Sequence, residues 1–154
     1  MNVNMDKARL IREIGETVML WQDATQAYDE QVGKRFGLNA AERHCIALLA
    51  AKGPQTASAI ARHVWLTPAA VTALLDRLEQ RSFLRRLPDP ADRRKIMVEA
   101  AEMTWVVAKE AYQPIGEAGQ RMLDEFSGRE LEAILKFLRG ALDVQKNFAK
   151  DSAS

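Results

Sequence analysis

Several features that would narrow the class of this 154-residue chain at once are scarce or missing. One cysteine excludes an intrachain disulfide. No apolar run approaches the roughly 18 residues of a membrane span, and the polar start Met1–Asp6 is unlike a signal peptide. Lys and Arg number 22 against 21 Asp and Glu, so neither sign of charge dominates. We therefore expect a cytoplasmic globular protein with no membrane partner, which can bind nucleic acid only through a local basic surface.

Catalytic and cofactor motifs are also lacking. The sequence contains no Gly-x-Ser-x-Gly, no phosphate loop and no recognisable nucleophile pair, so we predict no enzyme activity and no cofactor. Cys45 lies beside His44, but adjacent helical positions diverge by ~100° and do not face each other. His63 completes no zinc-ligand spacing, so no metal site is predicted. A buried, inert Cys45 is favoured, and a redox or metal switch through it stays an alternative.

Both ends of the chain have the apolar spacing of amphipathic helices. A long helix is predicted over residues 5–33, with its stripe extending to Phe36 and a stop at Gly37. Its stripe is spaced by three and four at Leu10, Ile14, Val18 and Trp21. Residues 102–126 predict a helix that Pro114 kinks or breaks, and Ser127–Glu130 forms a capping box before a last helix. These ends carry surplus apolar surface, which predicts a homodimer.

The middle of the chain predicts three closely spaced helices. Asn39 and Glu42 form a capping box that begins the first. Thr56 can cap a short helix over 57–64, and Thr67-Pro68 is a strong start for another. Two helices joined by about three residues are typical of a helix-turn-helix.

After these helices the pattern changes to that of a β-hairpin. Phe83–Leu87 and Lys95–Glu99 interleave apolar and charged residues around a turn-rich loop. A helix-turn-helix followed by a hairpin predicts a winged-helix lobe over residues 40–100. Between Arg77 and Lys95 seven basic residues face three acidic ones. We expect this local excess to lie against phosphate.

The start of the second short helix is built from small residues. Small side chains allow a helix backbone to enter the major groove, and its N-terminus can bind phosphate. The alternative interpretation is simply good helix-forming composition. Within this helix no Arg, Asn or Gln precedes Arg77, so we expect shape and wing contacts to contribute to sequence reading. The predicted DNA-binding residues are Thr67, Pro68, Ala69, Ala70, Thr72, Ala73, Arg77, Asp92, Arg93, Arg94 and Lys95.

Thr67–Glu79, followed by Asp89–Lys95, resembles the recognition helix and wing of the multiple-antibiotic-resistance regulator (MarR) family. The resemblance implies a dimeric winged-helix transcription factor, often a repressor, whose terminal helices form the dimer interface. It also implies that Arg93 or Arg94 enters the minor groove of double-stranded DNA while Asp92 holds the loop. Many members release DNA when a small aromatic ligand binds between the dimer helices and the DNA-binding lobe.

Two positions depart from the family pattern. Trp65 stands where the helix-turn-helix turn usually has glycine, and Ser82 stands where glycine usually follows the recognition helix. Glycine accepts a positive φ without penalty. The two residues must therefore either accept strain or use another turn geometry, and Trp65 could also pack over the helix pair.

Four aromatic residues lie on the two helices expected to border a ligand pocket: Trp21, Tyr28, Trp105 and Tyr112. Aromatic residues with a hydroxyl group suit a cleft for an aromatic ligand. A place in the core or in the dimer interface is the simpler alternative for each of them.

The sequence thus predicts a mainly α fold with a small β-hairpin wing. Residues 1–154 form a single winged helix-turn-helix domain, with a DNA-binding lobe at 40–100 and dimerisation helices at 5–36 and 102–150. The predicted function is sequence-specific DNA binding by a homodimeric, ligand-responsive repressor, on a pseudo-palindromic operator. A helical dimer that no longer binds DNA stays an alternative, as does the Cys45 switch.

Overall fold

A computed structural model describes residues 3–92 and 95–151, and the chain divides into two compact units, Met1–Ala111 and Tyr112–Ser154. The first unit holds the helix-turn-helix, the sheet and the core, and the second holds two helices. The boundary falls inside the predicted dimerisation segment 102–150, so its first ten residues belong with the lobe. Within the described ranges no helix is long and apolar enough to cross a membrane.

The first unit begins with the long helix α1 (Val3–Phe36), which ends at Gly37 with φ 64°. Helix α2 (Ala40–Lys52) starts with the predicted capping box. The Asn39 side chain accepts the Glu42 N–H at 2.9 Å, and the Glu42 carboxylate accepts the Asn39 N–H at 3.0 Å. Gly53 caps its C-terminus, so both signals of the sequence are confirmed.

The predicted helix-turn-helix is formed by α3 (Ala57–Val64) and α4 (Pro68–Gln80). The Thr56 hydroxyl accepts the Ala59 N–H at 3.2 Å, and the Thr67 hydroxyl accepts the Ala70 N–H at 3.3 Å. Pro68 occupies the first turn of α4, where its missing N–H leaves no helical bond unmade.

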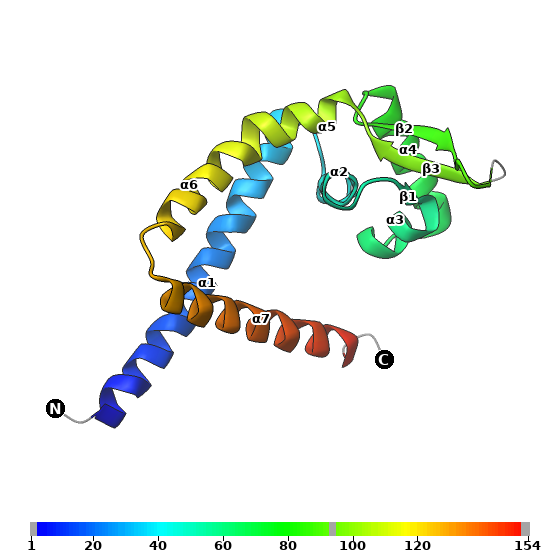
Figure 1. Ribbon diagram of the computed structural model, residues 1–154. Coiled ribbons are helices and arrows are strands. Elements are labelled where there is room, and N and C mark those ends of the chain that lie inside the picture. The colour runs from blue at the N-terminus through cyan, green and yellow to red at the C-terminus, as the bar shows by residue number, and fades with distance from the viewer. Residues whose placement is uncertain (1–2, 93–94, 152–154) are drawn as a thin grey trace. The chain divides into compact units, whose positions relative to one another are not determined.

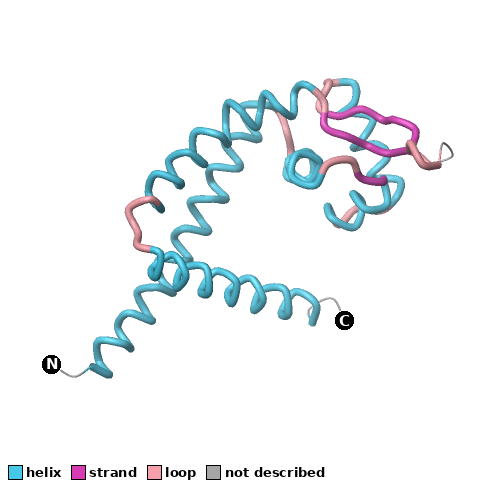
Figure 2. Tube along the Cα trace, in the orientation of Figure 1, coloured by secondary structure: helices cyan, strands magenta, loops and turns pink. Residues whose placement is uncertain are grey.

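Three antiparallel strands form a small sheet in the order β1-β3-β2 (Figure 2). Strands β2 (Leu84–Pro88) and β3 (Ile96–Ala100) are the predicted hairpin, paired from Leu84 opposite Ala100 to Pro88 opposite Ile96. The two-residue strand β1 (Gln55–Thr56) was not predicted. Two residues are too few to show alternation, and only its pairing with β3 makes it a strand.

The core fills the space between α2, α3, α4 and the sheet, which lie together beyond the C-terminal end of α1 in Figure 1. Its side chains come from the helices and from strands β2 and β3 with the residue before β2, and they include Leu49, Ile60, Leu74, Leu78, Phe83, Leu84 and Val98. Helix α5 (Glu102–Val107) adds Val107, and the Thr104 hydroxyl donates to the Phe83 carbonyl at 2.6 Å. The winged-helix fold class is confirmed.

The irregularity predicted around Pro114 takes the form of a π-helical turn, η1 (Ala108–Tyr112), before α6 (Gln113–Leu123). Pro114 has no N–H to donate to the carbonyl of residue 110, so the regular hydrogen-bond ladder of the helix is interrupted here. The helix ends at Leu123, earlier than the predicted Phe126, because Asp124–Phe126 close a turn. The Ser127–Glu130 capping box then begins α7 (Gly128–Asp151).

Candidate nucleic-acid interface

Helix α4 separates its residues cleanly between two faces. Its apolar stripe is buried: Val71, Leu74, Leu75 and Leu78. The predicted DNA-reading positions at its start all lie exposed: Thr67, Pro68, Ala69, Ala70, Thr72 and Ala73. The first two turns therefore present a narrow, nearly uncharged ridge to the outside of the chain.

The two threonine hydroxyls of this ridge already have internal bonds of opposite sense. Thr67 accepts from Ala70, so its own O–H is left to donate. Thr72 donates to the Pro68 carbonyl at 3.0 Å, so its oxygen is left to accept. A donor suits a phosphate oxygen, and an acceptor suits the exocyclic amino group of adenine or cytosine.

The two departures from the family pattern both accept the conformation that glycine would favour. Trp65 has φ 57° and Ser82 has φ 61°, and they are the two non-glycine residues with positive φ in the described part of the chain. Each costs about 1 kcal/mol relative to glycine. Trp65 does not pack over the helix pair, since it is 82% exposed.

Arg86 of β2 is bound to α4. Its guanidinium donates to Asp76 at 2.6 Å and to Glu79, and the Glu79 carboxylate also accepts the Arg86 N–H at 2.9 Å. Burial alone would lower the pKa of Arg86, but the hydrogen bonds to Asp76 and Glu79 outweigh it and the pKa is raised. The expectation that Arg86 faces phosphate is thus not met: it fixes the wing against the recognition helix.

The other arginines near the end of α4 also have partners within the first unit. Arg77, half exposed, donates to the buried Glu42 carboxylate at 3.2 Å. Arg81 donates to the carbonyl of Phe36, the last residue of α1, at 2.6 Å and to that of Gly37, which follows it, at 2.8 Å. These bonds connect α4 directly to α1 and α2. Arg85 pairs with Glu99 across the hairpin, so much of the basic cluster is internally neutralised.

The wing loop is organised by a residue that the sequence analysis did not single out. The Asp89 carboxylate accepts the N–H groups of Ala91 at 2.7 Å and Asp92 at 3.3 Å, as in an Asx-turn. The Lys95 N–H closes the loop by donating to the Asp92 carbonyl at 2.8 Å, and the Lys95 side chain is exposed. Arg93 and Arg94, the predicted tip, lie outside the described residues.

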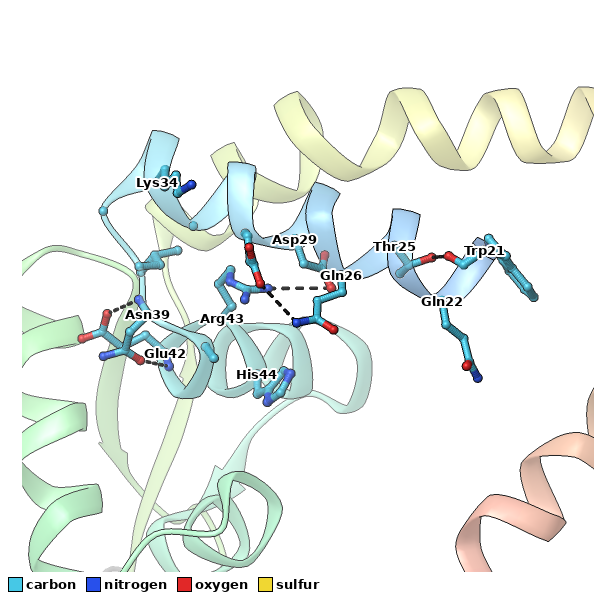
Figure 3. A pocket seen from close by; sticks show the side chains of 15 residues that line it. Trp21, Gln22, Thr25, Gln26, Asp29, Lys34, Asn39, Glu42, Arg43 and His44 are labelled. Atoms are coloured by element: carbon cyan, nitrogen blue, oxygen red, sulfur yellow. Dashed lines mark hydrogen bonds and ion pairs between the residues drawn. The ribbon is translucent and has the colours of Figure 1, made fainter. Parts of the chain in front are cut away.

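A groove of about 1140 Å³ runs between α1 and α2 (Figure 3). Of the four predicted pocket aromatics it contains Trp21 alone, beside polar groups such as Gln26, Arg43 and His44. The Tyr28 hydroxyl donates to the Ala111 carbonyl at 2.5 Å. Trp105 borders a separate hollow beside β2, and Tyr112 belongs to the second unit.

The floor of this groove depends on Gly33. A Cβ there would lie 2.6 Å from the Leu38 carbonyl oxygen and 3.0 Å from Arg43 Nε, so any side chain would push α1 away from α2. The Arg43 guanidinium pairs with Asp29 at 3.7 Å, while its Nε is buried without a hydrogen-bond partner among the described residues. Close packing of the two helices is thus achieved by glycine.

Cys45 is fully buried in α2, as predicted from the sequence. Desolvation first, and the nearby Glu42 carboxylate second, raise the pKa of its thiol to about 12. The thiol is thus protonated and shielded at neutral pH, which opposes the redox alternative. The residues that the structure describes contain no cluster of three or more metal-binding side chains.

Two signals in the sequence could have found what was missed. Asp76 and Glu79, three positions apart on one helix face, are spaced to hold a single arginine. Between Glu42 and Asp76 the chain contains no Asp or Glu at all, although it has 21 acidic residues in total. Helix α3, the turn after it and the first two turns of α4 therefore lack acidic side chains that would repel phosphate.

An exposed helix that follows a tight turn, held against an antiparallel hairpin, defines the winged-helix class of DNA-binding protein. The comparisons with known proteins agree. The MarR family model matches residues 38–96. Over 139 residues the chain is 30% identical to YcgE, an uncharacterized HTH-type transcriptional regulator of Bacillus subtilis, covering 90% of this chain and 85% of that one.

The chain belongs to the MarR family of DNA-binding transcriptional regulators, which are not enzymes. It is also 25% identical over 95 residues to the HTH-type transcriptional repressor NicR of Pseudomonas putida, across 62% of this chain and 60% of NicR. A MarR family protein from Bacillus stearothermophilus has the same fold, with a TM-score of 0.67 at 16% identity, covering 95% and 99% of the two chains.

Proposed function

We propose that this protein is a cytoplasmic, homodimeric repressor that reads a pseudo-palindromic DNA operator and responds to a small aromatic ligand. The observation that carries the proposal is the division of α4, whose apolar stripe closes the core while its small residues stay exposed. Thr67–Ala73 enters the major groove, with the Thr67 hydroxyl donating to phosphate and the Thr72 oxygen accepting from a base.

The wing contributes the second set of DNA contacts. Arg93, Arg94 and Lys95 reach the flanking minor groove or backbone, a role assigned from the family resemblance and from the exposure of Lys95. The bond between Arg86 and the acidic face of α4 supports a fixed spacing between helix and wing. Arg77 reaches DNA only if its bond to Glu42 leaves guanidinium donors exposed, and its half-exposed side chain is compatible with that.

Homodimerisation is supported by apolar residues left uncovered at both ends. The N-terminal part of α1 exposes Leu10, Ile14 and Trp21. Helix α6 buries no residue, and α7 exposes Leu131, Leu135, Phe137, Leu138, Leu142 and Phe148. A second copy would cover these stripes and place two recognition helices on half-sites about 34 Å apart.

Ligand response is supported by the connections of the groove. Glu42, at one end of the groove, holds Arg77 of α4, and Gly37, in its lining, holds Arg81. Suppose that a ligand between α1 and α2 binds one arrangement of these helices more tightly than another. It would then favour the position of α4 that goes with that arrangement, to an extent set by the difference between the two affinities. Repression follows the same geometry, because a protein seated on an operator excludes other proteins from it.

The main test places a carboxylate on the exposed ridge. Ala73→Glu should abolish operator binding in a fluorescence-anisotropy titration, because the new carboxylate would lie in the DNA interface and be repelled by the phosphates. Ala47→Glu, at an exposed position of α2, is the matched control. Operators come from selection on random duplex DNA. Tight binding by Ala73→Glu would exclude α4 as the reading helix.

The wing is tested by salt dependence. Arg94→Ala should weaken binding and make the slope of log affinity against log salt shallower by about one, since fewer counterions are released. A slope equal to that of the unmodified protein at two salt concentrations would remove the wing from the proposal.

A further inference from the structure

Trp65 has a large apolar side chain that its own chain leaves mostly uncovered. Trp65 is the C-cap residue of α3 and has a left-handed backbone conformation, and its backbone N–H donates to the Ala61 carbonyl. That backbone task suits glycine better than tryptophan. The indole is 82% exposed, so it adds little to the core. Because its backbone is strained and its ring is exposed, we look for a binding partner of Trp65 outside the chain.

The surroundings of Trp65 favour an anionic occupant with apolar faces. The ring borders a hollow of about 780 Å³ between α3 and α4, lined also by Ser58, Arg62, Pro68 and Thr72. Arg62 is exposed and makes no ion pair within the described residues. The acid-free run from Glu42 to Asp76 contains the whole hollow. The deoxyribose-phosphate backbone of DNA matches this chemistry.

The hollow is also continuous with the ridge assigned to the major groove, because Pro68 and Thr72 belong to both. When α4 lies in the groove, the turn before it meets the adjoining strand. We propose that Trp65 and Arg62 form a backbone clamp on the DNA. The indole ring packs against a deoxyribose, its N–H donates to a phosphate oxygen, and the Arg62 guanidinium pairs with a neighbouring phosphate.

This inference rests on the proposed function and predicts a particular pattern of loss. Trp65→Gly removes the ring and relieves the positive φ, so its melting temperature should equal or exceed that of the unmodified protein. Its affinity should nevertheless fall about tenfold, the loss expected for a hydrogen bond to a charged group. Because the contact is to the backbone, the same loss is expected on a selected operator and on an unrelated duplex. Trp65→Asn, which also tolerates positive φ, should behave alike.

Two further measurements distinguish the contribution of the Trp65 ring from that of the Arg62 charge. Arg62→Gln should reduce the salt slope by about one and leave the melting temperature unchanged. In the double variant Trp21→Phe/Trp105→Phe, the remaining Trp65 emission should be quenched as operator DNA is added. In Trp21→Phe/Trp65→Phe, which retains Trp105, the emission should change little.

The outcomes distinguish this inference from the proposed function. If Ala73→Glu loses operator binding but Trp65→Gly binds within twofold of the unmodified protein, the clamp is wrong and the recognition helix stands. If the unmodified protein shows no salt-sensitive DNA binding, both are wrong. If Trp65 emission responds to protein concentration and not to DNA, a second copy covers the hollow and the clamp is overturned.

Discussion

The lobe and the terminal helices use apolar residues in opposite ways. In the lobe, Leu74, Phe83 and Val98 are each 1% exposed, and helices and sheet close around them. On the terminal helices, Leu10 of α1 and Leu142 of α7 are each 51% exposed, although their spacing along the helix is equally regular. The lobe satisfies its apolar surface within one chain, whereas the ends carry a surface that a single chain leaves open.

This difference teaches that regular spacing alone does not tell where a helix will be buried. Periodicity marks a face that avoids water, but the partner of that face can be the same chain or another one. In the lobe the partner is brought by short connections between α2, α3, α4 and the sheet. Substitutions in each region test this contrast, and the largest effect is expected in the lobe.

The strongest test of the closed lobe is Leu74→Ala. Removal of a fully buried leucine should lower the free energy of unfolding by about 2–5 kcal/mol, because transfer energy is lost and a cavity remains. Urea unfolding followed by circular dichroism measures it. Leu131→Ala, on the open stripe of α7, serves as comparison and should leave the stability of the lobe unchanged. An equal loss of lobe stability in both variants would remove the distinction between the two regions.

The open ends are tested by Leu135→Asp. If a second copy covers α7, two carboxylates per dimer would be buried there, and dimer affinity should fall about a hundredfold, or ~3 kcal/mol. Sedimentation equilibrium measures the association constant, and tryptophan spectra report whether the lobe keeps its fold. Lys136→Asp, at an exposed position of α7 outside the stripe, introduces the same carboxylate and is the control. An unmodified protein that sediments as a folded monomer at micromolar concentration would contradict the proposed dimer.

The pH dependence of Cys45 measures how tightly the lobe excludes water. Its native pKa is raised to about 12, whereas the unfolded thiol ionises near 9.0. The thiol therefore contributes stability that is fully present below pH 9 and is lost between pH 9 and 12, by at most about 1.4 kcal/mol per pH unit. Unfolding of the unmodified protein and of Cys45→Ala at pH 8 and pH 10 isolates this contribution.

A second readout on the same residue tests the redox alternative. Iodoacetamide should leave native Cys45 unmodified at pH 8 and alkylate it in urea, and peroxide should leave DNA binding unchanged. Rapid alkylation of the native protein, or DNA release that is lost in Cys45→Ser, would revive the switch.

The smallest expected effect is a gain inside the lobe. Ser82 holds a positive φ of 61° after α4, so Ser82→Gly should raise stability by about 0.5–1 kcal/mol. Differential scanning calorimetry measures the shift in melting temperature. Ser58→Gly, within helix α3, should destabilise the protein and shows that glycine is favourable only at the strained position.

Local signals in the sequence were sufficient for much of the fold. The Asn39–Glu42 capping box, the Thr56 and Thr67 caps and the hairpin all formed as predicted, because each depends on residues a few positions apart. The positive φ at Trp65 and Ser82 was one of two options that the missing glycines left open. Strand β1 and the role of Arg86 were missed, since each requires a partner from another element. The role of Asp89 was also missed, although its partners lie only two and three positions along the chain.

Within the candidate site, the ridge of α4 could be predicted from the sequence, but the roles of the arginines could not. The exposed ridge of α4 followed from its composition and spacing, because a helix buries its apolar face and exposes the opposite one. The arginines could not be assigned in the same way. Arg77, Arg81 and Arg86 look alike in sequence, and only the positions of Glu42, the α1 carbonyls and Asp76 show that each is bound within the chain.

The amino-acid sequence by itself determined where helices begin and end, which face of each avoids water, and the family to which the chain belongs, since these depend on local bonding and periodicity. Tertiary structure alone decided which charges remain available to DNA and which aromatic residue borders the groove between α1 and α2. The physical reason is that a charge or an apolar face acquires its role from its partner, and that partner is brought near by folding rather than by position in the chain.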